Sequence, residues 1–189
     1  MLVEKGARLS CECYSVAGEY GNVHILDFLY EKYPQGFHTI IVSDIISAGQ
    51  LEVLKWLKEK GKQFSVHDRK YSACRGQLEV LKWLMDDKSG DDFPIDWYCY
   101  RMTDVVEHPH ILQYLFQIDP PSEAEAIRLL YFVAIGGHLK TLEWLHNTQG
   151  YNLNEAVFSA ALNSNQLPVI HWLITQGCPM NMLLPDFDA

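Results

Sequence analysis

The sequence predicts an all-α solenoid of about six helix–turn–helix repeats with short loops, and three observations lead to this fold class. Residues 49–57 and 76–84 both read Gly-Gln-Leu-Glu-Val-Leu-Lys-Trp-Leu, which is an internal duplication. Four looser copies of this segment occur elsewhere in the chain. The closing leucines of the six copies are 27 to 31 residues apart, and they are Leu29, Leu57, Leu84, Leu115, Leu145 and Leu173. A period of this length is typical of solenoids, in which each unit buries its apolar face against its neighbours.

The repeated segment has the pattern of an amphipathic helix. Its apolar residues recur at spacings of three and four, and its charged residues take the other positions. The glycine at the head of most copies predicts a tight turn, and the small or apolar residue before it indicates the end of a first, inner helix. The unit is therefore an inner helix, a turn, an outer helix and a loop. The outer helices are expected at 22–31, 51–59, 78–86, 109–117, 139–146 and 167–175.

The period divides one repeat domain, residues 1–189, into a partial repeat, six repeats and a tail. We expect the partial repeat at 1–10, the tail at 182–189, and the repeats at about 11–37, 38–64, 65–95, 96–121, 122–151 and 152–181. Because Leu2 lies 27 residues before Leu29, the chain is expected to begin in mid-repeat. It is then either a fragment of a longer array or an array capped by a half-unit. The tail is expected either to cover the last outer helix or to extend as a short peptide.

The inner helices of the first repeats differ in polarity. The first repeat ends near Phe37, where Tyr33-Pro34 and Gly36 break the helix. The inner helix of the second repeat is expected near residues 39–47 and is almost wholly apolar. The inner helix of the third repeat, residues 66–74, is more polar. This polarity departs from the pattern of the other inner helices.

The later repeats carry capping and proline signals. Pro109 is expected in the first turn of the fourth outer helix. Ser122 and Glu125 have the spacing of a capping box, which starts an inner helix that runs to Ile135 with one apolar face. Pro168 is expected just inside the last outer helix, where it removes no helical hydrogen bond.

The segment 134–145, Ala-Ile-Gly-Gly-His-Leu-Lys-Thr-Leu-Glu-Trp-Leu, and its counterparts resemble the second half of ankyrin repeats. The resemblance covers about residues 11–181, although the Thr-Pro-Leu-His opening of that family is missing from all six copies. The tryptophan shared by four outer helices resembles the divergent ankyrin arrays of large DNA viruses of amoebae and of some protists; it is Trp56, Trp83, Trp144 and Trp172. The period is shorter than the 33 residues of ankyrin repeats, so we expect their finger loops to be trimmed. The resemblance implies a protein-interaction module that holds its partner with inner helices and loops.

Composition excludes several classes of protein. The net charge of −9 and the pI near 5.3 argue against nucleic acid, because phosphate binding depends on clustered Lys and Arg. No window approaches 18 uninterrupted apolar residues, so no membrane span and no signal peptide are predicted. The five cysteines are scattered, which favours reduced thiols. We expect a soluble protein of the cytoplasm, or of the host cytoplasm if the source is a virus.

Three clusters contain possible metal ligands, and none has the pattern of a metal site. Cys11 and Cys13 lack a nearby histidine at zinc-finger spacing. The aspartates in 86–94 lack the alternating ligands and the glutamate of a calcium loop. His108 and His110 lack a third ligand. We therefore expect no metal and no cofactor.

The residues favour binding over catalysis. No phosphate-binding loop, nucleophile elbow or zinc-protease motif occurs in the sequence. We therefore expect a non-catalytic protein–protein interaction module, monomeric and without an identified partner, that serves as the recognition part of an adaptor or effector. The alternative is a structural protein that self-associates end to end.

The predicted partner site combines residues that depart from the repeat pattern. Trp97 is the one tryptophan outside the shared position, and it follows one repeat after a polar inner helix. Trp, Tyr and Arg are the residue types that most often anchor interfaces. The predicted site contains His67, Arg69, Lys70, Trp97, Tyr98, Tyr100 and Arg101, edged by Asp91 and Asp92. The alternative is structural, with Trp97 or Tyr100 filling the space left by the missing Thr-Pro-Leu-His side chains.

Overall fold

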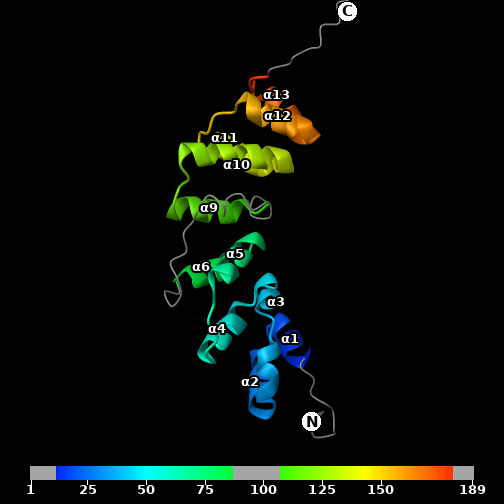
Figure 1. Ribbon diagram of the computed structural model, residues 1–189, viewed down its shortest axis with the longest axis vertical. Coiled ribbons are helices and arrows are strands. Elements are labelled where there is room, and N and C mark those ends of the chain that lie inside the picture. Colours follow the sequence, from blue (N-terminus) through cyan, green and yellow to red (C-terminus); the bar gives the residue numbers. More distant parts are fainter. Residues whose placement is uncertain (1–11, 87–106, 181–189) are drawn as a thin grey trace, which may run out of the picture. The chain divides into compact units, whose positions relative to one another are not determined.

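The computed structural model describes residues 12–86 and 107–180, and every regular element in these two stretches is a helix (Figure 1). The all-α prediction is therefore confirmed for the described residues. The chain divides into two compact units, residues 1–94 and 95–189, and each unit is described by itself. The predicted partial repeat, the predicted tail and the aspartate-rich loop at 87–94 lie outside the described residues.

Residues 12–86, the described part of the first unit, form three helical hairpins. Each hairpin has an inner and an outer helix, and the inner helices pack in chain order against one another. The first two outer helices also pack together. The hairpins are α1 (Glu12–Glu19) with α2 (Val23–Lys32), α3 (Val42–Ser47) with α4 (Leu51–Glu59), and α5 (Val66–Cys74) with α6 (Leu78–Asp86).

The second unit repeats this arrangement. Its inner helices α10 and α12 pack closely along each other, and its outer helix α11 lies between α9 and α13 (Figure 1). The helices are α9 (Pro109–Ile118), α10 (Glu123–Gly136), α11 (Leu139–Asn147), α12 (Glu155–Asn163) and α13 (Leu167–Thr175). The six outer helices begin and end within one residue of the predicted positions.

The turn between inner and outer helix has the same backbone geometry in each described hairpin. The glycine adopts a positive φ, for example +69° at Gly49, which L side chains rarely adopt. The next amide, that of Gln50, donates to the carbonyl of Ile45 at 3.1 Å, which closes the inner helix in a Schellman motif. In the last repeat Asn165 takes the place of glycine at φ +54°, which suits a residue that tolerates the left-handed region.

The closing leucines lie in the core of each unit. All six are at most 2% exposed, as are Leu54 and Leu81 on the same helix faces. The capping box of Ser122 and Glu125 is present, and Pro109 and Pro168 lie in the first turns of their helices, as predicted.

The start of the second inner helix was predicted wrongly. Residues Pro34–Thr39 form a 3₁₀ helix, η2, and α3 begins only at Val42. The Thr39 hydroxyl donates to the Gly36 carbonyl at 2.7 Å, which holds the tight turn. The buried ring of Tyr14 lies against Gly36, and its hydroxyl donates to the Tyr33 carbonyl at 3.0 Å. These local bonds compete with an α-helical start at Thr39.

Candidate functional site

Arg69, a residue of the predicted partner site, has a structural role. It is only 5% exposed, and its Nε donates to the Leu84 carbonyl at 3.1 Å in the last turn of α6. Carbonyls in a last helical turn have no partner within the helix, so the guanidinium caps α6 from the neighbouring α5. The expectation that Arg69 faces a partner is therefore corrected: its side chain is buried against α6.

Two other residues of the predicted site remain at the surface of the first unit. His67 is exposed and Lys70 is half-buried, and both lie on α5. The remaining residues of the predicted site, namely Trp97, Tyr98, Tyr100 and Arg101, lie outside the described residues, as do Asp91 and Asp92. The structure therefore places His67 and Lys70 on one helix and does not bear on the rest of the predicted site.

The second unit has an apolar groove along its paired inner helices. The groove has a volume of about 390 Å³ and lies between α10 and the start of α12. Ile127 and Tyr131 border it and are 42% and 41% exposed. The other residues that line it are Arg128, Phe132, Ala156 and Val157. Two large apolar side chains one helical turn apart thus lie at the surface, beside a hollow that another side chain can enter.

The groove arises because α10 is apolar on two sides. One side is fully buried in the unit, with Leu129, Leu130, Val133 and Ala134 all inaccessible to solvent. On the other side, Ala124, Ile127 and Tyr131 follow one another at spacings of three and four and are exposed. The sequence prediction assigned one apolar face to this helix. The sequence did contain a signal for the groove: α10 has a second set of apolar residues, Ala124, Ile127 and Tyr131, which stay exposed and are not needed for packing within the unit.

Exposed carboxylates begin the two helices that border the groove. Glu123 and Glu155 are the first residues of α10 and α12, and both are exposed. Residues 107–180 contain six Asp and Glu but only two Lys and Arg. Glu125 stays ionised more readily than an ordinary glutamate, because hydrogen bonds from Ser122 lower the pKa of its carboxyl. The excess of carboxylates over cations in residues 107–180 favours a ligand that carries positive charge.

Two residues of the groove and the two exposed or half-buried residues of the predicted site, His67 and Lys70, occupy equivalent positions in their repeats. Arg128 and Tyr131 lie nine and six residues before the turn glycine Gly137. His67 and Lys70 lie nine and six residues before the turn glycine Gly76. Both pairs therefore lie at the same positions of an inner helix, occupied by His and Lys in the third repeat and by Arg and Tyr in the fifth.

Residues 12–86 and 107–180 offer no candidate for a metal site or for a membrane-spanning helix. No group of three or more His, Cys, Asp or Glu side chains there is arranged to hold a metal ion. No helix there is both long enough and apolar enough to cross a membrane.

Comparison with known proteins gives no relative from which a function could be taken. No family model matches the sequence, and no curated protein matches it significantly.

Proposed function

We propose that this protein is a non-catalytic protein-interaction module of ankyrin-like helical hairpins, which works in the cytoplasm as the recognition part of an adaptor or effector. The observation that carries the proposal is the groove between α10 and α12, where Ile127 and Tyr131 are exposed. Exposed apolar side chains gathered at a hollow mark interaction sites more often than scattered ones do. A tyrosine beside an aliphatic residue is a common anchor of an interface.

The ankyrin-like part of the proposal is supported by repeated local structure. Each described hairpin has an inner helix, a left-handed turn residue and an outer helix. Three glutamines directly before outer helices donate to carbonyls at or near the end of the inner helix of the preceding hairpin; they are Gln50, Gln77 and Gln166. Such contacts between neighbouring units are what a repeat stack requires.

The chemistry of the groove points to one kind of partner, a protein segment with apolar anchors flanked by Lys or Arg. The apolar floor suits a leucine or aromatic side chain. Glu123 and Glu155, exposed at the starts of the two helices that border the groove, suit cations on the partner. Arg128 lies at the edge of the groove and is already close enough to Glu125 to influence its carboxylate, so its positive charge is partly offset.

A random-peptide phage library selected on the purified protein tests this function. We expect a consensus with one or two Leu, Phe or Trp residues and neighbouring Lys or Arg. Tyr131→Glu should weaken the selected peptides by at least about thirtyfold, as for an interface hot spot of about 2 kcal/mol. Leu162→Glu is the matched control, because Leu162 is a similarly exposed apolar residue on α12 that does not line the groove.

Two results would overturn the proposed function. One is an acidic consensus, or no consensus, among peptides that the wild-type protein retains. The other is equal loss of binding in Tyr131→Glu and Leu162→Glu, which would show that the groove is not where peptides bind. A turnover activity that a single side-chain change abolishes would contradict the non-catalytic part of the proposal.

A further inference from the structure

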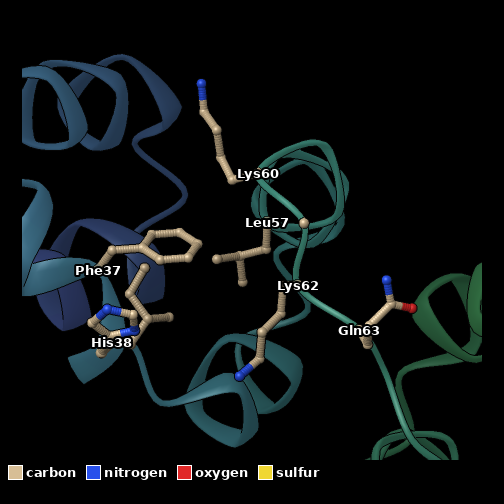
Figure 2. Close-up of a pocket in the computed structure, with 8 residues that line it drawn as sticks. Phe37, His38, Leu57, Lys60, Lys62 and Gln63 are labelled. Atoms are coloured by element: carbon tan, nitrogen blue, oxygen red, sulfur yellow. The ribbon is translucent and has the colours of Figure 1, made fainter.

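The first unit contains a pocket of a different character, between η2 and the loop that follows α4. Its volume is about 340 Å³, at the lower end of the range of roughly 300 to 1,000 Å³ for small-ligand sites. Phe37, Ile40 and Leu57 supply its apolar lining, and His38, Lys60 and Lys62 supply its polar lining. Figure 2 shows the ring of Phe37 turned toward the side chain of Leu57, with His38 and Lys62 on the two sides below them.

The apolar floor of this pocket is held in place by packing. Leu57 is buried in the core cluster, and Ile40 is largely covered. The Phe37 ring makes edge-on contacts with Tyr30, at 5.3 Å between ring centroids, and with Trp56, at 5.9 Å. A floor fixed in this way does not have to be ordered when a ligand binds, which lowers the entropic cost of binding.

Of the lysines near the pocket, Lys62 is the one available to a ligand. Lys60 extends away from the pocket in Figure 2; its Nζ lies 3.5 Å from Asp27 Oδ1 and 4.8 Å from the centroid of Tyr30. Lys58 Nζ lies over the Trp83 ring, at 5.6 Å from its centroid. Lys62 is exposed and follows the loop glycine Gly61, and His38, also exposed, comes from η2. Lys58 and Lys60 lie in or next to the last turn of α4, and His38 lies in the last turn of η2, where a helix C-terminus favours positive charge. Lys62 lies beyond both helices, so this interaction does not account for it.

Gly61 lines the pocket and has free space where a side chain would project. Gly61 has φ +89°, and within the described structure no atom lies within 4 Å of the position that a Cβ would take there. The segment 58–62 reads Lys-Glu-Lys-Gly-Lys and is positive, although the whole chain carries a net charge of −9. A local positive charge in an acidic protein, next to an apolar floor, matches a ligand with an anionic head and an apolar stem.

We propose that this pocket binds an anionic group, a phosphate or a carboxylate, that is carried on an aromatic or aliphatic stem. The stem lies on the half-buried ring of Phe37, and the anion accepts hydrogen bonds from the Lys62 ammonium and from a ring N–H of His38. The ligand is either a free small molecule or a side chain of a protein, such as a phosphorylated tyrosine. The inference does not depend on the groove between α10 and α12, which belongs to the other unit.

Phenyl phosphate is a suitable probe, titrated into the ¹⁵N-labelled full-length protein and followed by amide chemical shifts. We expect saturable shifts at the amides of His38, Gly61 and Lys62. Inorganic phosphate, which lacks the stem, and benzyl alcohol, which lacks the charge, should each bind at least about tenfold more weakly, the equivalent of about one charge-assisted contact. A short phosphotyrosine peptide distinguishes the sources: tighter binding than phenyl phosphate indicates a protein ligand, and equal binding indicates a small molecule.

The variant Lys62→Gln should lower the affinity for phenyl phosphate by about tenfold. Adding His38→Gln to it should lower this affinity further. Lys55→Gln is the matched control, since it removes the same charge from α4 at a lysine that pairs with Glu52 at 2.7 Å and does not line the pocket. If Lys62→Gln and Lys55→Gln lowered the affinity for phenyl phosphate equally, the loss would come from the change in net charge and not from the pocket. This result would overturn the proposal. So would equal affinity for phenyl phosphate and benzyl alcohol, or shifts confined to residues outside the pocket.

Discussion

The side-chain Nε2 of Gln77 donates a hydrogen bond to the backbone carbonyl of Ser47 at 2.8 Å, although the two residues are 30 positions apart. Gln77 precedes the outer helix α6, and Ser47 is the last residue of the preceding inner helix α3. Gln50 contacts the carbonyl of Glu19 in the same way, at 2.9 Å. The recurring glutamine of the sequence therefore ties the turn of one hairpin to the end of the inner helix in the preceding hairpin, and satisfies a carbonyl that this helix leaves without a partner.

Removing this side chain should destabilise the first unit. We expect Gln77→Ala to reduce the free energy of unfolding by about 0.5 to 1.5 kcal/mol, because the Ser47 carbonyl loses its donor in a part-buried position. Urea unfolding followed by circular dichroism measures this loss. Gln117→Ala, at an exposed position of α9, is the control and should change stability by less than about 0.5 kcal/mol. Equal effects of the two substitutions would show that the bond contributes nothing.

The turn glycines should differ in their tolerance of alanine. Gly49 has φ +69°, and a Cβ there would lie 2.5 Å from Gln77 Oε1. Gly61 has a similar φ, +89°, without a neighbour at that place in the described part of the chain. Both alanine variants should lose about 1 to 2 kcal/mol from the left-handed backbone, and Gly49→Ala should lose more. Combining Gly49→Ala with Gln77→Ala removes the clash, so the double variant should lose less than the sum of the two single losses; strict additivity would contradict this explanation.

His138 should make stability depend on pH. It takes the place that glutamine has in other repeats, and burial lowers the pKa of its imidazole below the ordinary 6.5, with Glu107 acting weakly in the opposite direction. Because the folded protein disfavours the charged form, the unfolded chain binds the proton more readily. The contribution to stability is therefore complete above pH 6.5 and is lost as the pH falls from 6.5 through the lowered pKa.

Urea midpoints measured between pH 7.5 and pH 5 test this dependence. In the His138→Gln variant, the decrease at low pH should be smaller than in the wild type. Glutamine is a fair replacement, since Gln166 at the same repeat position donates to the Ile135 carbonyl at 2.8 Å. If the dependence of the urea midpoint on pH were the same in the variant and the wild type, the pKa of His138 would be equal in the folded and unfolded states, and the prediction would be wrong.

Arg69 and His67 should respond differently to the same substitution. Arg69→Glu places a carboxylate in a nearly inaccessible site beside the Leu84 carbonyl, so we expect it to cost more than about 3 kcal/mol, as for a buried charge without a partner. His67→Glu lies at the exposed surface of the same helix and should change stability by less than about 0.5 kcal/mol. Thermal unfolding of the two variants measures the difference, and similar melting temperatures would place Arg69 at the surface after all.

The outer helices could be predicted from the sequence because their leucines and turn glycines recur at a nearly constant period. The inner helices could be predicted less well. Thr39 and Gly36 form a local hydrogen bond that replaces the expected helical start, and helix propensity alone does not include such a bond.

The site was the least predictable part. Arg69 reads as a surface residue, and its burial depends on the Leu84 carbonyl that only the folded hairpin brings near. Ile127 and Tyr131 read as core residues, and their exposure follows from the side of α10 that its neighbours leave uncovered. The recurrence of the glutamine was visible in the sequence. Its partner was not, because the accepting carbonyl belongs to the preceding hairpin, about 30 residues earlier in the chain.

Affinity capture from the source cells tests most directly the claim that the inner-helix groove binds a protein. Wild-type protein, the Ile127→Glu/Tyr131→Glu double variant and the Leu162→Glu control are compared by quantitative mass spectrometry, after circular dichroism shows that all three are folded. We expect a protein with a basic, apolar segment to be enriched on the wild type and on Leu162→Glu and lost from the double variant. Equal capture by all three folded proteins would contradict the proposed site, and no enrichment on the wild type over empty resin would contradict the proposed function.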